Sequence, residues 1–435
     1  MSAPKNSLDP VRILCLDGDG IGPEITAATR RVLQAVDDCF DLNLTLSTED
    51  IGFVSLAASG TTFPDKVLDA AKAAGGIVMG PVSTIDYPPA SEGGINPSGF
   101  LRKQLDLYAN IRPAKSYEGL PPRVGDKVDL VIARENTEGF YSDRSMFFGR
   151  AEFMPTEDMA LSVRKITRQA STRIARTGFE LAAQRRRKVT VVHKANVFQV
   201  SDGLFLEAVR AVRDEFPDFE YEEQIIDAMA ALLIRDPSQF DVIVTTNMYG
   251  DILSDEASEI AGSLGMAASL NAGETFAMAQ AQHGSAPSLA GKDQANPSSL
   301  IGSAAMLLRW IGEQREAPQF LAAADAIEQA IEKAVDPPCA GLVQAGWFWV
   351  IQGGCGPGGG EILPASERPH ALKITDAATM SGFAPKVPWA QVRCFPLICS
   401  SHVRYPSPIC HPPRCPRCGH IACERLPRCL RRPSA

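Results

Sequence analysis

The sequence lacks long apolar runs, and over most of its length it has almost no cysteine. No uninterrupted apolar stretch approaches the ~18 residues of a membrane span, so we expect no membrane segment. The opening MSAPKNSLDP has neither the apolar core of a signal peptide nor the arginine-rich character of a transit peptide, which favours a cytoplasmic protein. Residues 1–335 contain only Cys15 and Cys39, which excludes a disulfide scaffold there.

Charge is distributed unevenly along the 435 residues. The net charge is −8, but residues 386–435 hold nine Lys or Arg and one Glu, so they carry +8 and the rest carries −16. An acidic body of this kind argues against nucleic-acid binding. The content of 45% apolar and 22% charged residues is ordinary for a globular protein, and the length allows two or three domains.

Short apolar runs alternate with helical patterns, which predicts an α/β fold with a largely parallel sheet. Long helices are expected at 160–184, 202–216 and 251–264. Ligands of such sheets bind beyond the carboxyl ends of the strands, so polar residues that follow a strand are the candidates for a site. The expected strands lie within residues 11–18, 42–52, 76–82, 127–135, 188–196 and 240–250.

The turn LDGDGIGPE, after the first expected strand, resembles a dinucleotide fingerprint but departs from it. The G-x-G-x-x-G pattern requires a third glycine where Pro23 stands, and Asp19 would oppose a pyrophosphate. We therefore expect no pyrophosphate cradle. The alternatives are a tight turn into a helix with Pro23 in its first turn, or a loop that shapes another part of an active site.

Carboxylates in NMYGDILSDE suggest a metal site. Asp251 and Asp255 are four residues apart on an expected helix and therefore share one face. They are either acidic residues favoured by a helix N-terminus or oxygen ligands for Mg²⁺ or Mn²⁺. Asp227, in the segment YEEQIIDAMA, could complete the ligand set.

Three arginines and two proton-carrying side chains stand near other strand ends. Guanidinium groups bind carboxylates bidentately, so the arginines together with a metal suggest a substrate with several carboxylates. A single arginine is more often a surface residue, so the predicted substrate depends on the three arginines and the metal site taken together. The residues are Arg102, Arg112 and Arg134, with Tyr141 and Lys194 as candidates for moving protons.

Six separated motifs, in this order, give the chain a specific resemblance: GDGIGPEI, LDLYANIRPAKS, RENTEGFY, HKAN, NMYGDILSDE and HGSAPSLAGKDQANP. From about residue 12 to residue 335 the chain resembles the β-decarboxylating dehydrogenases, which include isocitrate, isopropylmalate, homoisocitrate and tartrate dehydrogenases. The resemblance implies a non-Rossmann, two-domain α/β fold. A large cofactor-side domain would comprise residues 9–107 and 263–335, and residues 108–262 would form an inserted domain for substrate and dimerisation.

The resemblance also implies oxidative decarboxylation of a 3-substituted malate by a homodimer with shared active sites. The three arginines would clamp the malate carboxylates. The metal would bind Asp251, Asp255 and Asp227 of the partner subunit. Lys194 of the partner subunit would be the general base on the 2-hydroxyl, and Tyr141 the general acid that protonates the carbanion.

The cofactor is expected at the motif HGSAPSLAGKDQANP. The residue after its proline is Ser288, a neutral side chain that neither repels nor balances a 2′-phosphate. NAD is therefore expected, with NADP as the alternative. The residues that match the adenosine loop of the family are His283, Gly284, Ser285, Ala286, Ser288 and Asn296.

Asn96 and Ser98, just before Arg102, are expected to meet the substituent on carbon 3 of the substrate. Polar groups there favour an isocitrate- or homoisocitrate-like acid over an isopropyl group. Isopropylmalate and tartrate stay open, and so does a helix cap as the role of the polar pair. A non-catalytic regulatory subunit is the alternative of another class.

Residues 336–435 depart from the pattern of the family. The segment CPRCGHIAC supplies zinc-ligand types at Cys415, Cys418, His420 and Cys423, but no second well-spaced pair. A zinc site, a basic interaction tail, and a disordered extension or gene-model error are the interpretations considered.

Overall fold

The computed structural model describes residues 9–141, 146, 151–262 and 264–335, together with the backbone of 350–351 and 362–363. The zinc and basic-tail hypotheses for residues 336–435 therefore lie outside the described residues, apart from the backbone of two short paired strands. These are β13 (Val350–Ile351) and β14 (Ile362–Leu363). Within the described residues, no helix combines the length and apolar character needed to cross a bilayer.

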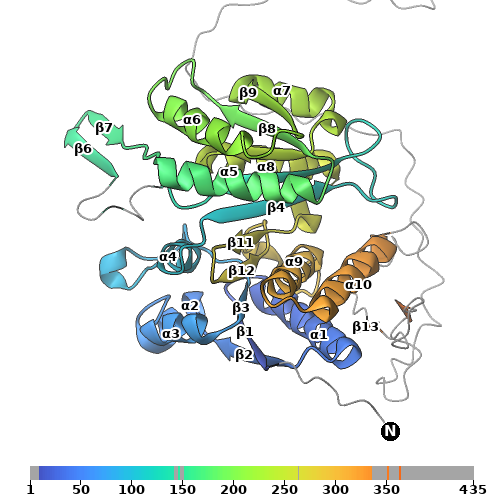
Figure 1. Cartoon of the computed structure of the whole chain (residues 1–435). Helices are drawn as coiled ribbons and strands as arrows, with labels where there is room; N and C mark the ends of the chain where they lie inside the picture. The colour runs from blue at the N-terminus through green and yellow to red at the C-terminus, as the bar shows by residue number, and fades with distance from the viewer. Residues whose placement is uncertain are drawn as a thin grey trace, which may run out of the picture. The chain divides into compact units, whose positions relative to one another are not determined.

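One ten-stranded sheet runs through the structure (Figure 1). Two strands from late in the chain, within residues 270–280, lie between the early strands β3 and β4. The strand order is β2 (Leu44–Glu49), β1 (Val11–Leu16), β3 (Gly76–Met79), β12 (Ala277–Gln280), β11 (Leu270–Ala272), β4 (Ala109–Lys115), β5 (Asp129–Glu135), β10 (Val242–Thr245), β8 (Lys188–His193) and β9 (Glu220–Ile225).

The predicted parallel character holds for both ends of the sheet but not for its middle. Neighbouring strands are parallel from β2 to β12 and from β5 to β9. β11 pairs antiparallel with both β12 and β4, and β4 pairs antiparallel with β5. The segments 9–107 and 264–335 meet the segment 108–262 at the β11–β4 pair. The division into a large and an inserted domain stays a prediction.

Helices cover both faces of the sheet, because apolar side chains alternate along the buried strands. Ile13 and Cys15 of β1 point to one face, and Leu14 and Leu16 point to the other. The first face carries α1 (Gly22–Phe40), α9 (Ser298–Gln314) and α10 (Pro318–Val335), and the second carries α2 (Gly52–Ser59), α3 (Asp65–Ala73) and α4 (Pro97–Gln104). On the other half of the sheet, α5 (Arg168–Ala183) and α6 (Ser201–Arg213) cover one face, and α7 (Ile226–Arg235) and α8 (Asn247–Ala261) cover the opposite face.

The expected helix at 160–184 is wrong in its first part. Residues 159–162 form β7 (Met159–Ser162), which pairs antiparallel with β6 (Glu152–Thr156) in a separate hairpin. α5 begins only after Thr167, whose hydroxyl accepts a hydrogen bond from the backbone N–H of Ala170 at 3.2 Å. A side-chain cap of this kind satisfies an N–H that has no partner within the helix, and it marks the true start.

Candidate active site

The glycine turn after β1 is organised by the carboxylate of a buried aspartate. Asp19 is 5% exposed. Its carboxylate accepts hydrogen bonds from the backbone N–H of Phe53 at 2.8 Å and of Ser83 at 2.9 Å, and from the hydroxyl of Tyr87. A carboxylate with these donors ties three loops together. It also places negative charge where a pyrophosphate would need positive charge.

The same turn packs against the loop that follows β12. Gly20 has φ +60°, and a Cβ on it would lie 2.0 Å from the carbonyl oxygen of Ser285, so no other residue fits. The N–H of Ile21 donates to that carbonyl at 2.9 Å. α1 follows with Pro23 in its first turn, as expected. The turn is thus both a tight entry into a helix and a support for the expected cofactor loop.

A cleft of about 240 Å³ lies at the carboxyl ends of β3, β12 and β5. It brings together residues from segments that are far apart in the sequence. Those expected from the sequence that line it are Asn96, Ser98, Arg102, Arg112, Arg134, Tyr141, Asp251, His283 and Gly284. Most of the expected substrate-binding residues therefore share one cavity with the start of the expected cofactor loop.

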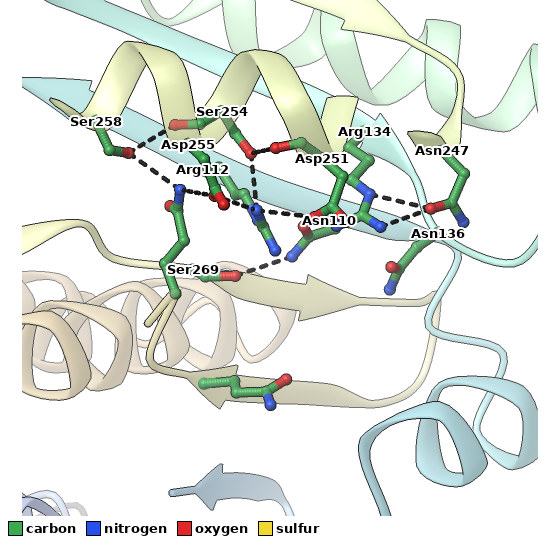
Figure 2. Close-up of polar contacts among 12 residues, drawn as sticks. Asn110, Arg112, Arg134, Asn136, Asn247, Asp251, Ser254, Asp255, Ser258 and Ser269 are labelled. Carbon is green, nitrogen blue, oxygen red and sulfur yellow. Dashed lines mark hydrogen bonds and ion pairs between the residues drawn. The ribbon is translucent and has the colours of Figure 1, made fainter. Parts of the chain in front are cut away.

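Two of the arginines are buried in the wall of this cleft (Figure 2). Arg134, 2% exposed, donates to Asn247 Oδ1 at 2.6 and 3.1 Å and to Asp251 Oδ1 at 2.5 Å. Arg112, 7% exposed, donates to Ser254 Oγ at 2.7 Å and lies 3.3 Å from both Asp251 and Asp255. Burial, and next the neighbouring Arg134, lower the pKa of Arg112 to about 10. Two guanidiniums held so close together favour a bound anion.

Asp251 and Asp255 lie on the same side of α8, as their spacing predicts. The Tyr141 hydroxyl donates to Asp251 Oδ2 at 3.4 Å. The side chains of Asp251 and Asp255 are 38% and 56% exposed, so both carboxylates can still be reached from outside. The described residues of this single chain contain no group of three His, Cys, Asp or Glu side chains placed to hold a metal.

Lys194 and Asp227 lie together, and neither lines the cleft. Lys194 follows β8 and Asp227 begins α7 after β9, the neighbouring parallel strand. The Lys194 ammonium donates to Asp227 Oδ1, and this contact lowers the pKa of the Asp227 carboxyl. The side chains are 23% and 69% exposed. The two residues expected to act on a partner subunit's site are therefore adjacent on this chain.

Asn96 and Ser98, the polar pair before Arg102, both form hydrogen bonds within the protein. Asn96 caps α4, because its Oδ1 accepts from the N–H of Gly99 at 3.0 Å. The hydroxyl of Ser98 donates to Gln280 Oε1 at 3.0 Å, and Arg102 approaches the same oxygen at 3.4 Å. The helix-cap alternative thus describes Asn96, although both side chains also line the cleft.

The expected cofactor loop is held from several directions. The hydroxyls of Ser285 and Ser83 are 2.7 Å apart, and His283 Nδ1 lies 3.0 Å from the carbonyl oxygen of Gly284. Asn296 Oδ1 accepts from the N–H of Ser298 at the start of α9. Ala286 has φ +37°, just before the short helix η5 (Pro287–Leu289) that presents Ser288 to solvent.

The sequence analysis missed two glutamines and the residues that orient the arginines. Gln280 contacts Ser98 and Arg102, and Gln282 donates to Asp255 Oδ1 at 2.9 Å. Asn247 and Ser254 accept from Arg134 and Arg112. Asn247 and Ser254 belong to NMYGDILSDE, whose helical spacing could have drawn attention to them, whereas the contacts of the glutamines join segments more than 20 residues apart.

Comparison with known proteins identifies the family of this chain. The family model for isocitrate/isopropylmalate dehydrogenase matches residues 12–341. A 3-isopropylmalate dehydrogenase of Sulfurisphaera tokodaii is 41% identical over 319 residues, which are 73% of this chain and 89% of that protein. An isocitrate/homoisocitrate dehydrogenase of Thermus thermophilus is 40% identical over 327 residues, which are 75% of this chain and 90% of that protein.

A solved structure shares the fold. The crystal structure of isocitrate dehydrogenase from Methylococcus capsulatus matches with a TM-score of 0.66 and 38% identity, over 75% of this chain and 91% of that chain. The expected family and its α/β fold are confirmed. The chain belongs to the isocitrate/isopropylmalate dehydrogenase family, the NAD-dependent β-decarboxylating hydroxy-acid dehydrogenases.

Proposed function

We propose that this chain catalyses the metal-dependent oxidative decarboxylation of a 3-substituted malate, with hydride transfer to NAD. The substrate is an isocitrate- or homoisocitrate-like acid. The observation that carries the proposal is the convergence of Arg102, Arg112 and Arg134 with Asp251 and Tyr141 on one cleft. Cationic donors in a partly enclosed site suit a substrate with two or three carboxylates.

Asp251 and Asp255 fit a divalent cation. Mg²⁺ takes oxygen ligands and is commonly bound by one or two carboxylates together with substrate oxygens. The two aspartates offer carboxylates from one side of α8, and both are partly exposed. Asp227 of the partner subunit would add a third. Such an ion, when bound, supplies Lewis-acid stabilisation of negative charge on the substrate oxygens.

Tyr141 and Lys194 are the residues to which we assign the proton transfers. The Tyr141 hydroxyl lies at the cleft, 3.4 Å from Asp251 Oδ2, and would protonate carbon 3 after carbon dioxide leaves. Lys194 of the partner subunit would accept the proton of the 2-hydroxyl as hydride departs. A monomer is then inactive, because it lacks the base at its own cleft.

Exposed apolar side chains support a homodimer. Ile234 of α7 is 55% exposed and Ile252 of α8 is 56% exposed, and both helices lie on the face of the sheet beside the cleft residues. The β6–β7 hairpin exposes Phe153 and Met154 as well. Large apolar side chains gathered on a surface are typical of protein contacts. A second copy that covers α7 and α8 would also bring its Lys194–Asp227 pair into the assembly.

NAD is the proposed cofactor, with NADP as the alternative. His283 and Gly284 line the cleft, and the rest of the loop extends from it to the exposed Ser288. No cation stands at Ser288 or at the next residue, Leu289, to balance a 2′-phosphate. The neutral serine hydroxyl can bond a ribose hydroxyl.

The test is NAD and NADP reduction by the full chain with Mg²⁺ or Mn²⁺, using isocitrate, homoisocitrate, isopropylmalate and tartrate in turn. We expect reduction of NAD and release of carbon dioxide with one of the first two acids. Asp251→Asn should abolish turnover, while Glu259→Gln, an exposed carboxylate on the same helix, should retain it. A folded dimer that oxidises none of the acids would instead be a non-catalytic subunit.

A further inference from the structure

Gln282 connects the expected cofactor loop to the helix that carries the two aspartates. It stands two residues after the end of β12 and directly before His283. Its backbone N–H donates to Ser299 Oγ at 3.2 Å, near the start of α9. The main chain is therefore held by the large helix α9 while the side chain crosses to α8.

The side-chain amide of Gln282 makes two contacts on α8. Nε2 donates to Asp255 Oδ1 at 2.9 Å and to Ser258 Oγ at 3.1 Å. A carboxylate oxygen only accepts hydrogen bonds, so the amide group beside Asp255 must be the NH₂, and the orientation of the amide follows. The Gln282 Oε1 atom is buried and has no hydrogen-bond partner among the described residues.

Both side-chain donors to Asp255 approach the same oxygen. Gln282 Nε2 and Arg112 Nη1 contact Oδ1, at 2.9 and 3.3 Å. Within the described part of the chain, nothing donates to Oδ2. An exposed aspartate has considerable rotamer freedom. Two donors on one oxygen restrict that freedom and leave the other oxygen available to a ligand.

We propose that Gln282 is a positioning residue that orients Asp255 for a divalent cation. The proposal rests on the metal role given to Asp255 in the proposed function and adds the group that prepares it. Hydrogen bonds to a ligating carboxylate reduce the ordering that metal binding must otherwise impose. Loss of such a partner commonly weakens metal affinity by about 10- to 100-fold.

The variant Gln282→Leu keeps the approximate size of the side chain and removes the amide. Mn²⁺ binding to the full chain is measured without substrate, from the electron paramagnetic resonance signal of free Mn²⁺. We expect Mn²⁺ affinity to fall about 10-fold or more, because Asp255 loses its better-placed donor. Ser258→Ala is the matched control, because it removes the other acceptor of Gln282 and leaves the Asp255 contact intact.

A double-variant cycle separates positioning from general damage to the loop. In an Asp255→Ala background, Gln282→Leu should weaken Mn²⁺ binding no further, because the group it positions is gone. Gln282→Ala gives a second measurement should the leucine variant fold poorly, with melting curves for each variant.

The possible outcomes separate the positioning role of Gln282 from the proposed reaction. Unchanged Mn²⁺ affinity in folded Gln282→Leu, or equal losses in both backgrounds, would overturn the positioning role even if the enzyme oxidises its acid. Mn²⁺ binding that depends on both Asp255 and Gln282, in a chain that oxidises none of the acids, would support the positioning role and sink the proposed reaction. A wild-type chain that binds no Mn²⁺ without substrate would overturn the positioning role, and the oxidation assay then tests the proposed reaction separately.

Discussion

Two groups of charged side chains lie on the same half of the sheet, and they are held in different ways. Arg112 and Arg134 stand on the antiparallel pair β4–β5, whereas Lys194 and Asp227 follow the parallel strands β8 and β9. Arg134 and Arg112 are 2% and 7% exposed, and Asn247, Asp251 and Ser254 accept hydrogen bonds from their guanidiniums. The Lys194–Asp227 pair is a single contact, with 69% of the Asp227 side chain exposed. The first group is assembled within one chain, whereas the second presents its functional atoms outward, as a group that serves another subunit would.

The largest combined effect on stability and turnover is expected from Arg134→Met, which breaks the buried group. The variant leaves the buried Asn247 Oδ1 without its donor and Asp251 without its closest cation. We expect a loss of about 2 kcal/mol in the free energy of unfolding and a fall of about a thousandfold in kcat/KM. Urea unfolding and steady-state kinetics measure the two quantities.

Arg123→Met is the control for this variant. Arg123 pairs with Glu259 on the surface, with 63% and 52% of the side chains exposed, so its loss should change neither stability nor turnover appreciably. If Arg134→Met and Arg123→Met had equal effects, the buried arginine would contribute no more to stability or turnover than an ordinary surface ion pair.

Lys194→Met tests the exposed pair and should separate activity from stability. The general base is lost, so kcat should fall by about 10²- to 10⁴-fold. The melting temperature should change little, because the carboxylate that pairs with Lys194 is largely exposed. A large fall in melting temperature would show that the pair is structural. Near-normal kcat would remove Lys194 from the reaction.

His193→Asn gives the smallest expected effect and concerns how the Lys194 loop is held. His193 is mostly buried, and its Nδ1 accepts from the N–H of Ala195 at 3.0 Å, so the neutral ring is favoured. Burial lowers the pKa of His193 below its usual 6.5. Above pH 6.5 neither state of the protein protonates the ring. As pH falls below 6.5 the unfolded chain binds the proton first, and stability is lost until the folded pKa is passed.

Asparagine offers an acceptor at a similar position but does not titrate. The variant should therefore lose less stability than the wild type between pH 7 and pH 5.5, by about a few tenths of a kcal/mol. Unfolding curves at both pH values measure the difference. Parallel pH dependences in the two proteins would assign the acid sensitivity to other groups.

The sequence predicted the elements of the fold better than their pairing. The apolar runs at β1, β3, β5, β8 and β10 were identified, because a buried strand requires continuous apolar residues. The antiparallel pairing of β4 and β11 in the middle of the sheet was not predicted. This pairing joins residues about 160 positions apart in the sequence, such as Asn110 and Asn271. A local sequence pattern does not indicate which distant segments will pair.

Residues of the site could be predicted from the sequence where their types and spacing indicate a chemical role. The i, i+4 spacing correctly placed Asp251 and Asp255 on one side of α8. The helix cap at Asn96 was one of the alternatives that the sequence left open, whereas the role of Gln282 was beyond prediction. Asn96 is a polar residue before a proline, and only the contact with Gly99 shows that it caps a helix. Gln282 reaches Asp255 across two elements, and such a contact depends on their packing.

The most direct test of the central claim, a reaction site shared between two copies, is subunit mixing. Lys194→Met and Asp251→Asn are purified as separate inactive dimers, then dissociated and reassociated at equal amounts. If Lys194 acts on the partner's cleft, each mixed dimer contains one intact site, and random pairing restores about a quarter of wild-type turnover. No recovery, in a sample shown to contain mixed dimers, would contradict the account, because both residues would then serve the same chain.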